Sequence, residues 1–348
     1  MESIELPEEH VVQVIDGGSV SKITDIKQAT LEAVRNPIGT QALSKLVHEG
    51  DKVALIVSDI TRTWSRTKDY LPAVVEELNN SGIPDADIFV IIATGTHRDN
   101  DDEEKRLILG DALFARLQVF DHDAYGSEAN VFLGTTSRGT PVYIDKRAVE
   151  ADKVILTGGI TTHLFAGFGG GRKSILPGIA SMKTIQQNHA HSLDPNEPHS
   201  NPAIGNAVLE GNPLHEDMCE AAAMVEQLYV VNLVMNAGMK LARITAGHWL
   251  DSWLEACKAA DAMYQTPIPE KADVIITSCG GYPKDMSLYQ GTKTIDNVEF
   301  GLKKGGTLVL LLNWRVAAVA WALFLLLWLT TRSVSYTHLR AHETSLHL

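Results

Sequence analysis

The sequence is short of cysteine and of positive charge. Its 348 residues include three cysteines, Cys219, Cys257 and Cys279, with no CxxC pair among them. That scarcity argues against a disulfide scaffold and a structural zinc site, and it fits a reducing, cytoplasmic compartment. Lys and Arg total 30 against 43 Asp and Glu, for a formal net charge of -13. Proteins that bind nucleic acid usually present a basic face, so no nucleic-acid partner is expected.

Long hydrophobic runs are also scarce. The N-terminus, MESIELPEEHVVQVI, has neither the basic region nor the apolar region of a signal peptide. The longest apolar run, Val316–Leu329, has 14 residues, whereas a membrane-spanning helix needs about 20. The composition changes abruptly near residue 313, and the ending YTHLRAHET resembles translated adapter sequence. We therefore predict that 313–348 is a frameshifted or adapter-derived tail and expect no membrane partner; the alternative is a C-terminal membrane anchor.

The rest of the chain has the composition of a folded protein. Hydrophobic residues make up 45% and charged residues 21%, close to the average for soluble globular proteins. A chain of this length can form two domains. Short runs rich in Val and Ile recur at 52–58, 88–93, 154–156, 274–277 and 307–312. Continuous rather than alternating apolar runs indicate strands that are buried on both faces of a parallel sheet.

Helical patterns lie between these runs. Leu71, Val74, Val75 and Leu78 follow helical spacing, for example. Strands that alternate with helices predict an α/β fold of two domains with mostly parallel sheets. The segment QTPIPEKAD, with two prolines and several charges, suggests a domain boundary. We expect an N-terminal α/β domain over 1–265, and over 266–312 only the beginning of a second α/β domain, which is incomplete.

Polar clusters follow several of the predicted strands: DITR, TGTHR, GITTH and SCGGYP. In parallel α/β sheets, ligands bind at the carboxyl ends of the strands. Asp59 and Arg62 belong to the first cluster, and a guanidinium there can grip a carboxylate or a phosphate. From the residues alone, however, Asp59 could equally cap a helix and Arg62 could be solvated. Gln290 and Lys293 would by themselves rate as ordinary residues on a helix surface.

The densest feature is a glycine-rich segment. Gly169, Gly170 and Gly171 stand directly before Arg172 and Lys173. Glycine turns expose backbone N–H groups, and two neighbouring cations would complete a cradle for an anion. The segment matches neither the P-loop nor the dinucleotide-binding pattern, because Arg172 stands where each requires glycine. A flexible turn with two solvated cations is the alternative.

Three histidines lie near strand ends or near this segment: His97, His163 and His189. Imidazole binds nickel, zinc or copper, and it transfers protons near neutral pH. A single histidine is more often structural, and no HExxH motif specifies zinc. Several other histidines are expected at the surface: His10, His48, His122, His199 and His248. The residues by themselves thus indicate an α/β enzyme with an anionic ligand and a histidine-based site.

The segment HLFAGFGGGRKSILPGIASMKTIQQNHA closely resembles the signature of the nickel-dependent lactate racemase family. The resemblance extends to SDITR, ATGTHR, GNPLHEDM and GGYPKDMSLYQGTK, in the family's order, and so covers roughly residues 10–312. The long central motif makes the resemblance specific.

The resemblance implies a cofactor. The family carries a nickel pincer nucleotide, a pyridinium mononucleotide with two sulfur-bearing arms that is tethered covalently to a lysine, here Lys173. One histidine, here His189, is a nickel ligand. Three further elements match cofactor-supporting positions: the glycines Gly169–Gly171, Arg172 and Asp59. Enzymes that build the cofactor are implied as partners.

The resemblance also implies a reaction. Family members racemise or epimerise lactate or related 2-hydroxy acids by reversible hydride transfer through a 2-keto acid. His97 and His163 match the acid/base pair, one for each face of the substrate. The groups that match the substrate-binding positions are Arg62, Gln290 and Lys293. Two alternatives remain open: a nickel-independent transferase that binds a phosphate or nucleotide, and an inactive truncated fragment.

Overall fold

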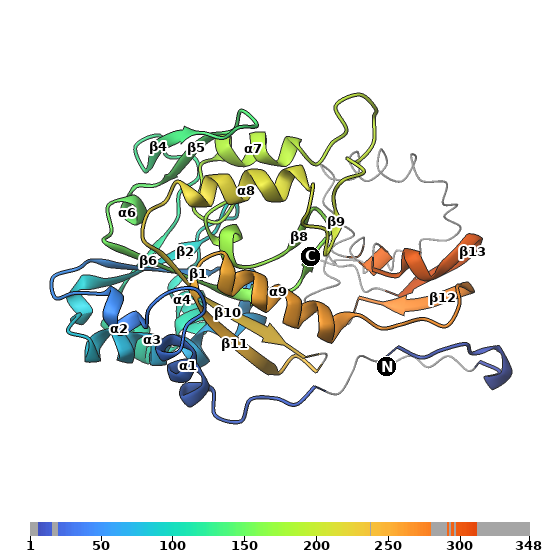
Figure 1. Ribbon diagram of the computed structural model, residues 1–348, viewed down its shortest axis with the longest axis horizontal. Helices are drawn as coiled ribbons and strands as arrows, with labels where there is room; N and C mark the ends of the chain where they lie inside the picture. The colour runs from blue at the N-terminus through green and yellow to red at the C-terminus, as the bar shows by residue number, and fades with distance from the viewer. Residues whose placement is uncertain are drawn as a thin grey trace, which may run out of the picture. The chain divides into compact units, whose positions relative to one another are not determined.

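Figure 1 shows the computed structural model of the protein, which describes residues 6–15, 20–236, 238–279, 291, 294–295 and 297–311. Gln290, Lys293 and the predicted tail lie outside the described residues. The chain divides into two compact units. The larger contains Asp16–Ser192 and Ala203–Thr266, and the smaller contains Met1–Ile15, Leu193–Pro202 and Pro267–Leu348.

A six-stranded sheet forms the centre of the larger unit, in the order β11-β10-β6-β1-β2-β3. Neighbouring strands from β10 to β3 pair in parallel, and β11 pairs antiparallel with β10. The strand bounds are β1 Val53–Ser58, β2 Ile88–Ala93, β3 Gln118–Asp121, β6 Lys153–Ile160, β10 Leu228–Met235 and β11 Leu241–His248. The predicted α/β fold with a mostly parallel sheet is confirmed.

The apolar strands are buried because helices cover both faces of the sheet. On β1, Leu55 and Val57 face one core cluster, while Ala54 and Ile56 face another. Helices α1 (Ile26–Arg35) and α3 (Thr67–Asn80) cover the first face. Each fully buried Val, Leu or Ile side chain stabilises the fold by about 1.5–3 kcal/mol. This two-sided burial explains why the strands read as continuous apolar runs.

The opposite face carries α7 (Met182–Ala190), α8 (Pro213–Ala223) and α9 (Asp251–Tyr264), as Figure 1 shows. Asn212 caps the N-terminus of α8, because its side chain accepts hydrogen bonds from the N–H groups of Leu214 and His215.

Shorter elements complete the larger unit. The helices are α2 Leu43–Leu46, α4 Asp102–Leu109, α5 Asp111–Arg116 and α6 Lys146–Val149. One hairpin joins β4 (Asn130–Thr135) to β5 (Pro141–Asp145), and a three-stranded sheet contains β7 Thr162–His163, β8 Ala166–Phe168 and β9 Gly205–Asn206. The 3-10 turns are η2 Ile60–Ser65, η3 Asp85–Asp87 and η4 Gly171–Ser174.

The smaller unit contains two parallel strands, β12 (Ala272–Ser278) and β13 (Leu302–Leu311), at the positions where the sequence predicts them. It also contains the 3-10 turns η1 (Glu8–His10) and η5 (Glu299–Gly301). Within the described part of the chain, no helix has the length and apolar character needed to cross a membrane.

Candidate active site

Three neighbouring strands deliver the polar clusters to one edge of the sheet. β1 ends at Ser58 directly before Asp59, β2 ends at Ala93 shortly before His97, and β6 ends at Ile160 shortly before His163. The strands β6, β1 and β2 are adjacent and parallel, so their carboxyl ends share an edge. Ligands of such sheets bind at this edge.

Asp59 holds the ring of His97. The carboxylate is 2% exposed, and its Oδ2 lies 2.5 Å from His97 Nδ1. Its Oδ1 accepts hydrogen bonds from Thr61 Oγ1 at 2.6 Å and from Arg62 Nη1 at 3.3 Å. Burial by itself would raise the pKa of Asp59, but the hydrogen bond from His97 and the charge of Arg62 outweigh it, and the pKa lies below its ordinary value.

This arrangement assigns the two nitrogens of the His97 ring. Nδ1–H donates to the carboxylate, so Nε2 is the nitrogen that can take a proton from a substrate. The side chain of His97 is half exposed, as is that of Arg62. Asp59, which the sequence assigns to cofactor support, thus lies against His97.

The glycine loop is packed too tightly for side chains. Gly170 and Gly171 have φ of +65° and +52°, values that favour glycine. A Cβ on Gly171 would lie 2.3 Å from Trp253 Cδ1. Trp253 Nε1–H donates to the carbonyl of Gly169 at 2.9 Å, and the Gly169 N–H donates to the carbonyl of Thr161 at 2.8 Å. The loop is therefore fastened to both α9 and the end of β6.

Arg172 turns into the core rather than outward. Its side chain is completely buried, and it donates to His215 Nδ1 at 2.8 Å and to the carbonyls of Ala166 and Phe168 at 2.6 and 3.2 Å. The guanidinium also lies 3.9 Å from the centroid of the Trp253 ring. Direct contact with the phosphate of a cofactor, as the sequence suggests, does not fit this placement; Arg172 instead anchors the loop from within.

Burial lowers the pKa values of Arg172 and of its hydrogen-bond partner His215. It lowers the pKa of Arg172 to about 10, so the guanidinium stays protonated at pH 7. It also lowers the pKa of His215 to about 3, with the charge of Arg172 as a second cause. A neutral His215 can accept the hydrogen bond that Arg172 donates, whereas a protonated one could not.

Lys173 follows Arg172 in the sequence, and its side chain contacts His163, a candidate catalytic residue. Its Nζ lies 2.9 Å from His163 Nε2. Nδ1 of His163 lies 3.2 and 3.1 Å from the backbone nitrogens of Phe165 and Ala166, whose N–H groups donate to it. Because Nδ1 is committed to the backbone, Nε2 is the atom of His163 that faces the lysine and any ligand attached there.

His189 lies on the last turn of α7, and its Nδ1 donates to the carbonyl of Ile185 at 3.0 Å. That hydrogen bond leaves Nε2 as the ring nitrogen that could bind a metal. Burial, and secondly the charge of Lys173, lower the pKa of His189 to about 4, so the ring is neutral at pH 7, the form that binds a metal.

A backbone hydrogen bond joins two of the loops at this edge of the sheet. The Gly95 N–H, in the loop that carries His97, donates to the carbonyl of Gly178, five residues beyond Lys173, at 2.9 Å. The structure thus ties the loop of His97 to the loop of Lys173. Within the described ranges, no three His, Cys, Asp or Glu side chains come together to hold a metal. A metal that takes one ligand from His189 and the rest from a cofactor fits this donor set.

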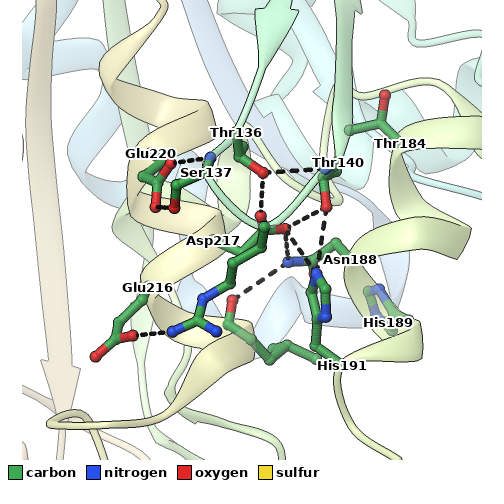
Figure 2. A network of polar contacts seen from close by, with 12 residues as sticks. Thr136, Ser137, Thr140, Thr184, Asn188, His189, His191, Glu216, Asp217 and Glu220 are labelled. Carbon is green, nitrogen blue, oxygen red and sulfur yellow. Dashed lines mark hydrogen bonds and ion pairs between the residues drawn. The ribbon is translucent and has the colours of Figure 1, made fainter. Parts of the chain in front are cut away.

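Some residues that shape the site escape prediction from sequence. Trp253 and His215 support the glycine loop, and Asp217 forms a buried polar network beside α7 (Figure 2). Asp217 falls within the motif GNPLHEDM, and an acid on an Ala-rich apolar helix is a signal that could have singled it out.

The expectation that His122 lies at the surface is wrong. The residue is 2% exposed, and its ring lies between Asp145 Oδ2 and the carbonyl of Ala180, at 3.0 Å from each. A histidine at the end of a strand can thus be entirely structural.

Comparison with known proteins gives consistent matches. The family model for the lactate racemase N-terminal domain matches residues 1–200, and the model for the lactate racemase C-terminal domain matches residues 268–315. A lactate racemase from Thermoanaerobacterium thermosaccharolyticum is 34% identical over 310 residues, which cover 88% of this chain and 71% of the relative. A lactate racemase from Lactiplantibacillus plantarum is 33% identical over 290 residues, which cover 83% of this chain and 66% of the relative.

Solved structures agree. The lactate racemase apoprotein from T. thermosaccharolyticum has a TM-score of 0.77 and 35% identity, covering 88% of this chain and 70% of that one. A protein from Thermotoga maritima has a TM-score of 0.57, with 75% of this chain and 64% of that one covered. Its identity of 20% indicates a shared fold only.

Proposed function

The chain belongs to the lactate racemase family, and we propose that it interconverts the two stereoisomers of lactate or a closely related 2-hydroxy acid. The observation that carries the proposal is the contact between Lys173 Nζ and His163 Nε2. The lysine that would carry the cofactor thus lies beside one of the two proposed acid/base residues.

The residues fit the cofactor that the family uses, a nickel pincer nucleotide. Lys173 would carry the tether, and the neutral His189 would offer Nε2 to the nickel. The turn at Gly170 and Gly171 would offer its backbone to the phosphate of the nucleotide. When bound, this cofactor supplies a reversible hydride acceptor.

The protein's own side chains would then move the hydroxyl proton. Inversion of one carbon requires an acid/base group on each face of the substrate. His97, with Nδ1–H held by Asp59, would take or return the proton at Nε2 on one face. His163 would serve the other face as the acid: its Nδ1 accepts from the backbone, so the neutral ring carries its proton at Nε2, the atom that would deliver it.

Two cationic groups and one amide would hold the carboxylate of the substrate. Arg62 lies on the same turn as Asp59 and is half exposed, so its guanidinium can reach a ligand above the strand ends. Gln290 and Lys293 belong to the same proposal through the family resemblance.

The proposal includes partners and a compartment. Enzymes that assemble the nucleotide and insert nickel must act before the protein can work. A reducing, cytoplasmic setting agrees with the three cysteines, which are all free thiols.

The test is to produce the protein together with a cofactor-forming system. We expect intact mass to show an adduct, metal analysis to show nickel, and chiral chromatography to show both enantiomers formed from either one. Lys173→Ala should lose the adduct, whereas His189→Ala should keep the adduct and lose nickel. Racemisation by a protein with neither adduct nor nickel would contradict the proposal.

A further inference from the structure

We propose that Asp217 is a positioning residue that holds the end of α7 and thereby aims Nε2 of His189. The inference rests on the proposed function, because only there does His189 bind nickel. Figure 2 shows Asp217 on α8, beneath the hairpin of β4 and β5 and beside the last turn of α7.

Asp217 is a fully buried carboxylate held by neutral donors. Its Oδ1 accepts from Thr136 Oγ1 at 2.5 Å, and its Oδ2 accepts from Thr140 Oγ1 and from Asn188 Nδ2, both at 2.8 Å. His191 Nε2 lies farther away, at 3.8 Å from Oδ2. A carboxylate that leaves water must be fully hydrogen-bonded to be tolerated. The three short hydrogen bonds meet that condition by joining the hairpin and α7 to α8.

The link to His189 runs through Asn188, its neighbour on the helix. Asn188 is fully buried, and its Nδ2 donates to Asp217 and, at 3.3 Å, to the carbonyl of Leu214. The hydrogen bond from His189 Nδ1 to Ile185 then fixes the ring relative to the helix. Any rotation of the last turn of α7 therefore moves the imidazole.

The first turn of α7 is anchored separately. Thr184 Oγ1 donates to the carbonyl of Pro141 at 2.8 Å and accepts from the N–H of Tyr143 at 3.0 Å. Both residues belong to β5, so the start of the helix would stay in place without Asp217. The carboxylate of Asp217 instead holds the turn that carries His189.

Glu220 provides a matched control on the same helix. Its carboxylate accepts from Ser137 N at 2.6 Å and from Ser137 Oγ at 2.5 Å, so it too joins α8 to the hairpin. Glu220 binds Ser137 in the turn between β4 and β5, on the solvent side and away from Asn188 (Figure 2). Glu220→Gln thus weakens the same junction without touching the link to α7.

The experiment compares wild type, Asp217→Asn, Glu220→Gln and His189→Ala, each produced with the cofactor-forming system. Intact mass reports the adduct on Lys173, and metal analysis after dialysis against increasing chelator reports nickel retention. The charge-transfer absorption of the bound nickel reports its ligand geometry.

We expect Asp217→Asn to form the adduct but to lose nickel at about 10–100-fold lower chelator concentration, as is typical when the support of a metal-binding histidine is removed. Its nickel absorption should also shift. Glu220→Gln should match wild type in all three measurements. Wild-type nickel retention by Asp217→Asn, or equal loss in Glu220→Gln, would overturn the proposal.

A second variant covers the case in which Asp217→Asn does not fold. Asn188→Leu removes the link and keeps the two threonine donors on Asp217, and it should weaken nickel retention in the same direction. If it retains nickel like wild type, Asp217 does not position His189.

A wild-type protein without nickel, or His189→Ala with full nickel, would instead refute the proposed function. Nickel lost in His189→Ala but kept in Asp217→Asn would refute the positioning role alone.

Discussion

Lys173 Nζ lies 2.9 Å from His163 Nε2, while both backbone N–H groups at Phe165 and Ala166 point at the other nitrogen of the ring. The ring can therefore turn only one nitrogen toward a ligand, and that nitrogen already faces the amine of the lysine. A cofactor attached to Lys173 would take the place of this contact. Lys173 and His163 are thus neighbours in the protein itself.

The first prediction concerns the acid/base pair. General acid–base assistance is typically worth about 10²–10⁴-fold in rate. His97→Ala and His163→Ala should each lower the racemisation rate by at least that factor while adduct and nickel are retained. Chiral chromatography with intact mass and metal analysis checks this. If either variant racemises at the wild-type rate, that histidine has only a structural role.

The second prediction concerns the contribution of Asp59 to folding stability at acidic pH. Its pKa lies below the ordinary value, so the ionised carboxylate favours the folded state. That contribution is complete above about pH 4, the value of an unfolded Asp, and it is lost as the pH falls through the lower folded pKa. The stability of Asp59→Asn should therefore decrease less steeply than that of wild type as the pH is lowered below 4. Thermal unfolding at a series of pH values measures the difference, and parallel curves would contradict it.

The third prediction concerns His215. Its folded pKa of about 3 lies below the unfolded value of about 6.5, so between these values the unfolded chain binds more protons. Its contribution to stability is complete above pH 6.5 and is lost as the pH falls toward 3. His215→Gln keeps an acceptor for Arg172 and should reduce the loss of stability in this window. Chemical unfolding at pH 7, 5 and 4 tests this, with His48→Gln, an exposed histidine, as control. An equal pH dependence in the His215 and His48 variants would count against it.

The fourth prediction concerns Gly171. An alanine there combines a positive φ with a Cβ 2.3 Å from the ring of Trp253. At Gly211, φ is +72° but no atom lies within 4 Å of the added Cβ. Gly211→Ala should cost about 1–2 kcal/mol of folding free energy from the backbone alone.

Gly171→Ala should cost more than Gly211→Ala, because the clash displaces Trp253 as well, and it should reduce formation of the Lys173 adduct. Denaturant unfolding and intact mass measure both effects. Equal stability losses in the two variants would show that the loop is not packed against Trp253 as described.

Much of the fold was predictable because the signals are local. The continuous apolar runs at Val53–Ser58 and Ile88–Ala93 require cover on both faces, and this requirement is enough to predict a parallel sheet. The polar residues Asp59, His97 and His163 follow strands directly, so the edge that gathers them was predictable too.

The sequence alone determined the strand ends, the glycine turn and the family motif, since each depends on residues that are neighbours in the chain. Only the tertiary structure decided where side chains point and which charges are buried. Arg172 turns inward because Trp253 and His215, both distant in the chain, provide an aromatic face and an acceptor. Asp217 is tolerated in the core because donors from the hairpin and from α7 meet there. A buried charge needs its partners in space, and a linear pattern does not record which distant segments will supply them.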